Sequence, residues 1–587
     1  MDNKYIEKLD IIGGSAAVVP AVEYGQVLEY PGEDVKEHRG DLHRTFKARH
    51  IQMICLGGCI GSGIFISTGK ALRNGNYTGM YIGWTLICTM SWTLMQVMSE
   101  ACCIFPTSGA FVDHAARFVD PALAFAIGFC EWFGWITVVA SEGAIFRVII
   151  SYWTTSIPTA ACMTIYLVVV FAIHMFPNRM FAEFEFGTAA AKVVAMVVIL
   201  LTCIAIVAGA GPTGSTHHAE NYTQLPAFPN GYKGVAQAFL LAAWSTGGQE
   251  IMGITNGEAD FPRWNLPRAC NQLLFRIFVF YLGSVTMITV LVPYTDPRLL
   301  GTSSIAASPF VIAMNDAGIK VLPDILNVVI LIGLCAIGAE SLYISSRIST
   351  AMARMHMFPA IFGRIDSKGR PYMSLLIAMA LSTIFTYINC SNTGAVIFTW
   401  FSSISATVYF LSYITICITN WRMRAAFKAQ NDNPLTLQYA YRNKFFPLGS
   451  VFLFSSSIFV LASVFYVSLF PIHAPTTAET FFETFLCVPL FIVLYLGYKI
   501  VYRTKIVDPA KADLQTGRRP LNERDIAFLD AYYSKKALAT QHTRQFQPEN
   551  RADRTATDSI SAIVERTAET PVKRGEREES KNRNESP

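Results

Sequence analysis

Two clusters of glycine interrupt apolar stretches of this chain. Residues 57–65 read GGCIGSGIF and residues 244–250 read WSTGGQE. Such interruptions are the pattern of broken membrane helices, in which unwinding frees backbone N–H and C=O groups that lipid cannot satisfy. A polar solute can satisfy them, because half-helix N-termini favour a carboxylate and exposed carbonyls favour an ammonium. We therefore predict a solute site between the two breaks. The alternative is that the glycines only permit close helix packing.

The composition is that of a membrane protein. Of the 587 residues, 52% are apolar and 15% are charged, against about 25% charged in an ordinary soluble protein. These totals argue against a soluble enzyme, a coiled coil and an intrinsically disordered protein, and the net charge of +5 is too diffuse to suggest nucleic-acid binding. Because the cysteines lie mostly inside apolar runs and no CxxC occurs, we expect reduced packing residues, with no disulfide framework and no metal site.

Twelve apolar segments are long enough to cross a ~30 Å hydrocarbon core, which takes about 20 residues of helix. They lie at about 50–71, 79–103, 122–150, 159–176, 186–209, 235–257, 271–293, 322–346, 372–389, 393–419, 446–470 and 482–501. The predicted fold class is an all-α membrane protein with twelve transmembrane helices in a transporter domain, 49–502. Residues 1–48 form a cytosolic N-terminal tail without a signal-peptide pattern. The polar residues 503–587 are predicted to be a cytosolic, largely disordered tail with a short helix around 521–534.

Lysine and arginine predict the orientation. Fourteen of them fall in the expected inner loops and five in the expected outer loops, which places both termini in the cytosol. Sequons at Asn76, Asn221 and Asn389 fall in expected outer loops, whereas the one at Asn584 lies in the tail. We predict Asn76 and Asn221 as glycosylation sites.

The two glycine clusters lie five predicted spans apart, so the helices that carry them cross the membrane in opposite directions. This spacing is typical of an inverted five-helix repeat whose broken helices meet at the midplane. A P-loop is excluded for the first cluster, because apolar membrane sequence flanks it and no strand precedes it.

Several stretches resemble fungal amino-acid permeases of the amino acid–polyamine–organocation superfamily. The stretches that carry the resemblance are RHIQMICLGGCIGSGIF (49–65), FPTSGAF (105–111), ARFVDPALAFAIGF (116–129), GQEIMGITNGEADFPRWNLPRA (248–269) and SLYISSR (341–347). The resemblance runs from about Arg49 to Lys428 and more weakly to Tyr502. It implies a LeuT-like fold, a 5+5 inverted repeat plus two helices, and a proton symporter that imports amino acids or related amines at the plasma membrane.

The resemblance also implies a substrate site. The residues it points to at the two breaks are Gly61, Ser62 and Gly63 for the substrate carboxylate, and the carbonyls of Ser245, Thr246, Gly247 and Gly248 for the α-amino group. Trp244 resembles an aromatic residue that stacks on the substrate in related antiporters. Its alternative role is a packing or interface tryptophan.

Lys192 lies in the apolar sequence TAAAKVVAMVVIL. A lysine within hydrocarbon is costly and by default indicates function, although one this near the end of a span can also snorkel to the surface. The resemblance implies that the ammonium group of a lysine at this position takes the place of the sodium ion that other members of the superfamily bind. The ammonium group of Lys192 is then expected to reach carbonyls near Gly57 to Ile60 and to take part in proton coupling.

Two glutamates match family positions. Glu142 is expected in the substrate site, and Glu250 is expected to couple protons along the inner half of the path. For each, the alternative is a neutral carboxyl hydrogen-bonded between helices.

Three charged residues depart from the family pattern: Glu131, Arg147 and Glu340. Glu340 stands in an apolar span where the family usually has serine, and we place it with Glu142 in the central cavity. Carboxylates there would attract a substrate with a cationic group, such as a basic amino acid, a polyamine or a carnitine-like betaine. Against this, Arg147 could neutralise one carboxylate or snorkel outward, and either glutamate could be protonated or paired between helices.

Three classes of function use a membrane fold of this kind: a secondary transporter, a nutrient sensor and a membrane enzyme. A secondary transporter is the function that we expect. Its expected partners are a small-molecule substrate (an amino acid or a related amine), protons, the lipid bilayer and, on the tails, cytosolic trafficking or ubiquitination factors. A nutrient sensor of the same fold is the alternative, although known sensors of this family tend to have longer N-terminal tails. No HxxxD, HExxH or GxSxG occurs in the inner loops, so we expect neither an enzyme nor a cofactor.

Overall fold

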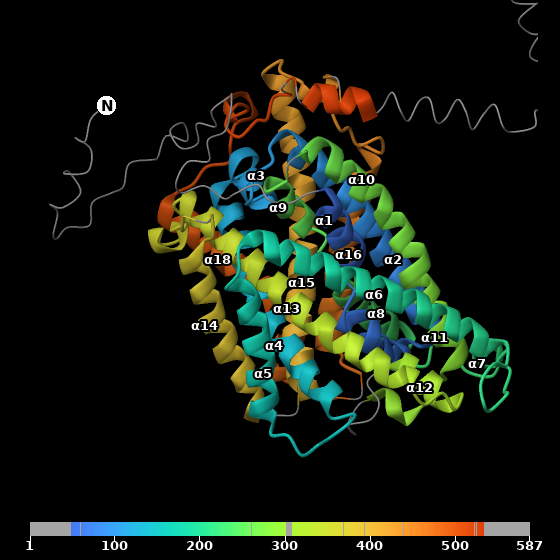
Figure 1. Ribbon diagram of the computed structural model, residues 1–587. Helices are drawn as coiled ribbons and strands as arrows, with labels where there is room; N and C mark the ends of the chain where they lie inside the picture. The colour runs from blue at the N-terminus through green and yellow to red at the C-terminus, as the bar shows by residue number, and fades with distance from the viewer. Residues whose placement is uncertain are drawn as a thin grey trace, which may run out of the picture. The chain divides into compact units, whose positions relative to one another are not determined.

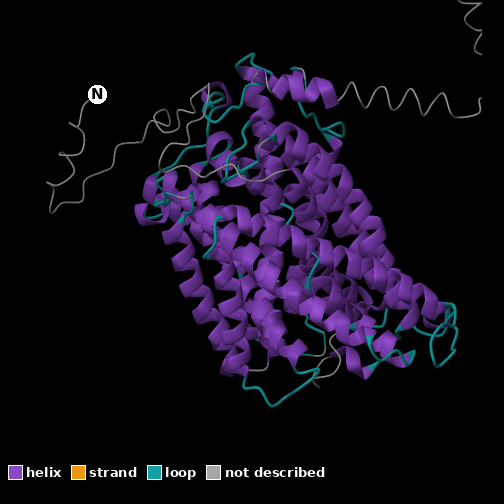
Figure 2. Cartoon of the chain, viewed as in Figure 1, coloured by secondary structure: helices purple, strands orange, loops and turns teal. Residues whose placement is uncertain are grey.

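Helices make up the regular structure, and no strand occurs in the part of the chain that is described (Figures 1 and 2). The computed structural model describes residues 48–532 apart from 59, 260, 301–307, 368, 392–393, 438, 473, 522 and 524. The described residues up to Pro520 form one compact unit, and those from Leu521 belong to another. The helices below belong to the first unit.

The first predicted span is broken at its glycines. Helix α1 (Ala48–Met53) continues into η1 (Ile54–Gly58), and helical structure resumes at η2 (Gly63–Ser67). That turn runs directly into α2 (Thr68–Ile104), whose one non-helical residue is Asn76, at φ 53° and ψ −168°. The expected outer loop between the first two spans is therefore a kink, which corrects the prediction for this connection.

The sixth predicted span is broken in the same way. Helix α8 (Gly231–Thr246) ends before the glycine pair, and α9 (Ile251–Gly257) begins after it. Gly248 has φ +83°, a conformation that favours glycine. A Cβ atom added to Gly63 would lie 2.9 Å from the backbone nitrogen of Ser245, closer than real side chains approach. The two breaks thus pack backbone against backbone, so the glycines both interrupt the helices and permit their close approach.

Other helices pack around the breaks. Those that contribute to the site below are α4 (Pro121–Ile150), α6 (Asn178–Val207), α13 (Leu322–Arg354) and α15 (Gly394–Ala429). The sequence explains the start of α4, because Asp120 caps it by accepting a 2.9 Å hydrogen bond from the backbone nitrogen of Ala122. Helix α4 packs against both α13 and α15, as Figure 1 shows at the centre of the bundle.

The remaining helices complete the unit. They are α3 (Phe111–Phe118), α5 (Thr159–His174), α7 (Glu220–Thr223), α10 (Pro262–Phe275), α11 (Gly283–Leu291), α12 (Pro309–Asp316), α14 (Tyr372–Ile388), α16 (Leu448–Leu469), α17 (Ala478–Phe485) and α18 (Cys487–Tyr502).

Six helical segments are long and apolar enough to cross a membrane: Pro121–Ile150, Asn178–Val207, Pro262–Leu291, Leu322–Arg354, Ser403–Ala429 and Leu448–Leu469. Many exposed side chains on such helices are large and apolar, among them Val194, Leu201 and Phe278, as expected of surfaces that face lipid. The chain is therefore an all-helical, multi-pass membrane protein. The full count of twelve spans and the orientation of the termini remain predictions.

Residues 504–520 differ from the disordered tail that was expected. The backbone nitrogen of Val507 donates to the carbonyl of Val119 at 2.9 Å, and that of Arg519 donates to the carbonyl of Ile104 at 3.0 Å. Leu514 is buried in an apolar cluster that also contains Phe105. Because apolar side chains recur within this polar stretch, it packs on the bundle. A helix follows at 525–532 within the predicted 521–534, while 1–47 and 533–587 lie outside the described residues.

Candidate functional site

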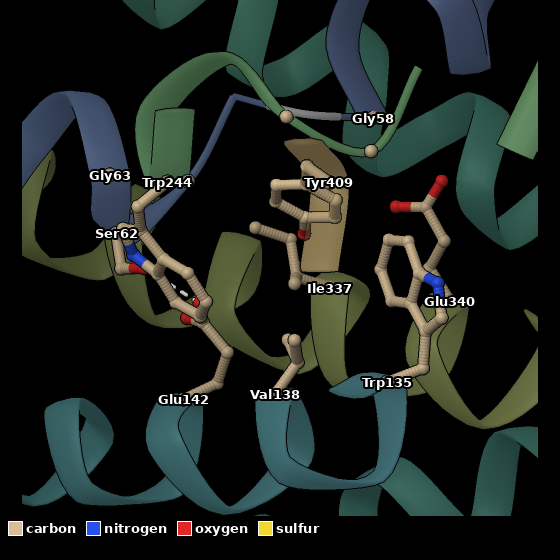
Figure 3. A pocket seen from close by; sticks show the side chains of 13 residues that line it. Gly58, Ser62, Gly63, Trp135, Val138, Glu142, Trp244, Ile337, Glu340 and Tyr409 are labelled. Carbon is tan, nitrogen blue, oxygen red and sulfur yellow. Dashed lines mark hydrogen bonds between the residues drawn. The ribbon is translucent and has the colours of Figure 1, made fainter. Parts of the chain in front are cut away.

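A cavity lies between the two breaks, and the space between its lining atoms is about 430 Å³ when the part open to solvent is included (Figure 3). The broken helices supply most of its wall, and the rest comes from α4, α13 and α15. Its lining residues are Gly58, Gly61, Ser62, Gly63, Trp135, Val138, Glu142, Trp244, Gly247, Gly248, Ile337, Glu340 and Tyr409. Eight of the ten residues predicted for substrate binding are thereby brought to one place, and the other two are Ser245 and Thr246.

Ser62 stands at the centre of a polar group on one side of the cavity. Its hydroxyl donates a 2.6 Å hydrogen bond to Oε1 of Glu142, while Trp244 Nε1 donates to the Ser62 hydroxyl at 3.3 Å. The other carboxylate oxygen of Glu142, Oε2, is buried and has no hydrogen-bond partner. The serine hydroxyl is therefore already engaged by the protein's own carboxylate. Each of these three side chains remains within reach of a bound solute.

Glu340 lies on another side of the cavity, beside Trp135 and apart from Ser62 and Glu142 (Figure 3). It is 5% exposed, and its Oε1 atom has no hydrogen-bond partner. A Cβ atom added to Gly58 would lie 3.1 Å from that oxygen. The carboxylate thus stands against the end of the first half-helix, in the space that a side chain at Gly58 would occupy.

The second break contributes less than predicted. Gly247 and Gly248 line the cavity, whereas Ser245 and Thr246 do not. The hydroxyls of Ser245 and Thr246 donate to carbonyls four residues earlier in α8, at 2.9 Å each. The carbonyl of Thr246 itself accepts a 2.6 Å hydrogen bond from the Gln249 side chain. That carbonyl, expected to hold the α-amino group, is thus already partly satisfied within the protein.

Lys192 reaches the first break from α6. It is fully buried, and its Nζ atom donates to the carbonyl oxygen of Gly58 at 3.2 Å. The predicted contact with carbonyls near Gly57 to Ile60 is therefore present, and snorkelling to the surface does not occur. Lys192 is not part of the cavity lining, because Gly58 lies between its ammonium group and the cavity. Its expected role in coupling stays a prediction.

Glu250 lies just before α9 and outside the cavity lining. It is fully buried, and neither carboxylate oxygen has a hydrogen-bond partner. Glu185 precedes Lys192 by seven residues on the same face of α6 and is in the same condition, although no pattern in the sequence singled it out. The alternative of a glutamate hydrogen-bonded between helices is therefore not realised at Glu250.

Glu131 is accounted for by local packing. One oxygen accepts a 3.0 Å hydrogen bond from Trp135 Nε1 and the other accepts from the hydroxyl of Ser412. Glu131 does not line the cavity, so it adds no charge to the substrate site. Arg147 does not line it either, and so does not face Glu142 or Glu340 there.

Five lining residues were not predicted for substrate binding: Gly58, which lies in the stretch expected to contact Lys192, and Trp135, Val138, Ile337 and Tyr409. Three of them carried a usable signal, because residues three, four or seven apart share one face of a helix. Trp135 and Val138 precede Glu142 by seven and four residues, and Ile337 precedes Glu340 by three. No comparable signal pointed to Tyr409.

The predicted glycosylation sites are both hydrogen-bonded. Asn76 is 1% exposed and its Nδ2 atom donates to the carbonyl of Pro226 at 2.7 Å. Asn221, in α7, donates to the carbonyls of Thr289 and Val290 at 3.1 and 2.9 Å. Since glycosylation needs an accessible Nδ2, the structure does not support the expectation that Asn76 lies in an exposed outer loop.

A buried ion pair lies at the end of the bundle to which residues 504–520 bind. Arg347 Nε donates to Oε1 of Glu258 at 3.0 Å, and the guanidinium lies 3.8 Å from the ring centroid of Tyr343. Tyr343 stacks in turn on Phe181 with ring centroids 4.9 Å apart. These contacts join the end of α9 to α13 and to α6.

Comparison with known proteins decides the family. Residues 50–510 match the family described as "Amino acid permease". The chain belongs to the amino acid permease family. It is 36% identical to the amino-acid permease GAP5 of Candida albicans, over 84% of this chain and 80% of that protein. It is 34% identical to the general amino-acid permease GAP1 of Saccharomyces cerevisiae, over 85% and 84%, and 32% identical to the cationic amino acid transporter 1 of Schizosaccharomyces pombe, over 84% and 85%.

Membership of the amino acid permease family confirms the family resemblance and the expectation of a transporter rather than an enzyme. Among the described residues, no group of three or more His, Cys, Asp or Glu side chains could hold a metal ion. The chemistry of the site is therefore that of hydrogen-bonding backbone, two carboxylates and aromatic rings around a small cavity.

Proposed function

We propose that this permease is a proton-coupled secondary transporter that imports amino acids or related amine solutes across the plasma membrane, with both termini in the cytosol. The observation that carries the proposal is the cavity between the two broken helices. It lies within a bundle of membrane helices, and its wall combines backbone at two helix breaks with Ser62, Glu142 and Trp244. A zwitterion needs both donors and acceptors, and half-helix ends supply them.

Lys192 supports the coupling part of the proposal. Its ammonium holds the Gly58 carbonyl at the back of the first break, so a change in its charge would alter the end of the half-helix that lines the cavity. A lysine can lose and regain a proton when buried, whereas arginine cannot. Proton binding and solute binding would thus act on the same backbone segment.

The names of the relatives fit this proposal without fixing the substrate. One is called general and another cationic, so both broad and basic amino-acid selectivity occur among proteins of similar identity to this chain.

Uptake tests the function. In a yeast strain without its own amino-acid permeases, the expressed protein should accumulate labelled amino acids from acidic medium, and a protonophore should abolish accumulation. Saturable binding by the purified protein, with no uptake by cells that display it at the surface, would instead identify a sensor.

A further inference from the structure

We propose that this transporter selects solutes with two cationic groups separated by an aliphatic chain, and that Glu340 is the residue that recognises the second cation. The inference rests on the proposed function and names its substrate class.

The ionisable side chains in the cavity wall favour a cationic solute. Among the described lining residues, the charged ones are Glu142 and Glu340, and none is basic. The two carboxylates lie on different sides of the cavity, with Ile337 and Tyr409 between them in the view of Figure 3. A solute that spans the cavity therefore meets a carboxyl group at each end, and each of these groups is negative when it is ionised. A second ammonium is attracted at Glu340, whereas an acidic side chain is repelled there.

The carboxylate oxygens of the cavity wall that have no hydrogen-bond partner also favour a cationic solute. Glu142 Oε2 and Glu340 Oε1 are both buried and without a partner. A buried carboxylate oxygen without a partner is costly, and a carboxylate can only accept. The missing partner is hence a donor, and an ammonium group offers three N–H donors as well as the opposite charge.

The aromatic lining suits the same ligand. Trp135, Trp244 and Tyr409 line the cavity, and Trp135 stands beside Glu340 in Figure 3. Aromatic faces attract ammonium groups, and they also pack against the methylene groups of an aliphatic chain. Val138 and Ile337 extend that apolar wall.

The competing role for Glu340 is to neutralise Lys192. The two groups interact electrostatically, and Glu185 and Arg276 belong to the same neighbourhood. However, the hydrogen bond of Lys192 goes to the Gly58 carbonyl, and no ion pair within 4 Å joins Lys192 to Glu340 among the described residues. Lys192 does not line the cavity, whereas Glu340 does. The carboxylate is therefore free to receive a solute cation from the cavity side.

Three compounds that are related to lysine separate the possibilities. Lysine carries an α-carboxylate and two ammonium groups, norleucine has the same four-carbon side chain without the terminal ammonium, and cadaverine is lysine without its carboxylate. Labelled lysine uptake by the wild-type protein should be competed by unlabelled lysine at least about tenfold more effectively than by norleucine. Cadaverine competing as well as lysine would indicate a polyamine-type solute, and weak competition by cadaverine would indicate a basic amino acid. Both results support the dication class.

The matched variants are Glu340→Gln and Glu131→Gln, which remove one buried carboxylate each, inside and outside the cavity wall. Glu340→Gln should bring the ratio of lysine to norleucine affinity close to one, and Glu131→Gln should leave that ratio unchanged. Because the ratio is taken within one variant, it does not depend on expression. If Glu340→Gln fails to fold, Glu340→Ser removes the same carboxyl group and tests its role, while the wild-type comparison decides the substrate class.

Two results would overturn the inference. One is wild-type uptake of norleucine as efficient as that of lysine, which leaves the proposed transport function intact. The other is an equal loss of lysine and norleucine affinity in Glu340→Gln, which would mean that Glu340 serves only to neutralise Lys192. Absence of uptake for every amino acid and amine would instead contradict the proposed function itself.

Discussion

Lys192 holds the carbonyl oxygen of Gly58 at 3.2 Å, from a helix that does not itself line the cavity. The contact places a buried cation directly behind the backbone that forms the wall of the site. A glycine at 58 leaves room for Glu340 on the cavity side of the same residue. Solute and proton would therefore act on opposite sides of one interrupted turn.

Lys192→Ala should lose concentrative uptake while retaining exchange or binding, because the helix breaks themselves remain. Lys192→Arg should fail as well, since arginine does not release a proton in the working pH range. Accumulation driven by a pH gradient should be compared with counterflow in proteoliposomes. Normal pH-driven accumulation by both variants would rule out Lys192 as the coupling group.

Ser62→Ala should weaken the apparent affinity for substrate by about 1–3 kcal/mol, because Glu142 loses its donor and Trp244 loses its acceptor. Folding should be largely intact, as judged by surface expression and melting temperature. Ser67→Ala is the matched control, since Ser67 is a buried serine at the other end of η2 and lies outside the cavity lining. An unchanged affinity in Ser62→Ala would count against a site at this hydroxyl.

Glu258→Gln should destabilise the protein by about 3–5 kcal/mol, because Arg347 is left buried without its carboxylate. The double variant Glu258→Gln with Arg347→Gln should be more stable than the single variant, since no charge is then left unpaired. Thermal unfolding of the purified variants in detergent measures both effects. A double variant less stable than Glu258→Gln alone would show that the pair is not what makes the single change costly.

Removal of the chain after Tyr502 should lower the melting temperature, whereas removal after Tyr532 should not. Only the first deletion removes residues 504–520, which bury Leu514 against the apolar cluster around Phe105 and bond to the backbone of Val119. Equal melting temperatures of the two truncated proteins would show that this segment does not stabilise the bundle.

Asp296 should make the stability of the connection between α11 and α12 depend on pH. Hydrogen bonds from Arg298 hold the pKa of Asp296 below its ordinary value. A carboxyl group whose pKa is lowered in the folded protein stabilises the fold when the pH is above its pKa in the unfolded chain, which is about 3.9. This stabilisation is lost as the pH falls through the lower pKa of the folded state. The melting temperature of the wild type should therefore exceed that of Asp296→Asn by a constant amount above about pH 5, and the difference should shrink below about pH 4.

The same comparison made with Asp316→Asn is the control. Asp316 also bonds Arg298, at 2.6 Å, but it is half exposed, so its loss should cost less. A wild-type advantage over Asp296→Asn that grows as the pH falls would contradict the assignment.

Much of the architecture could be predicted from local sequence. The two helix breaks follow from glycine clusters in apolar runs, and the helical segments follow from hydropathy, because each of these properties is set by neighbouring residues. The contact of Lys192 with the first break came from resemblance to a family and is present in the structure. The docking of residues 504–520 was missed, because a few apolar residues in a polar stretch do not reveal which distant surface will bury them.

The sequence by itself determined that this is a helical membrane protein with two interrupted helices, and which charged residues lie in its apolar segments. It could not decide what each charge does, because the six carboxyl groups Glu131, Glu142, Glu185, Glu250, Glu258 and Glu340 look alike in sequence. Tertiary structure separated them. Glu131 is bonded by neighbours and Glu258 by Arg347, whereas Glu142 and Glu340 face one cavity with an unpartnered oxygen each. The partners of a buried charge come from helices distant in the chain, so only the packing of those helices decides its role.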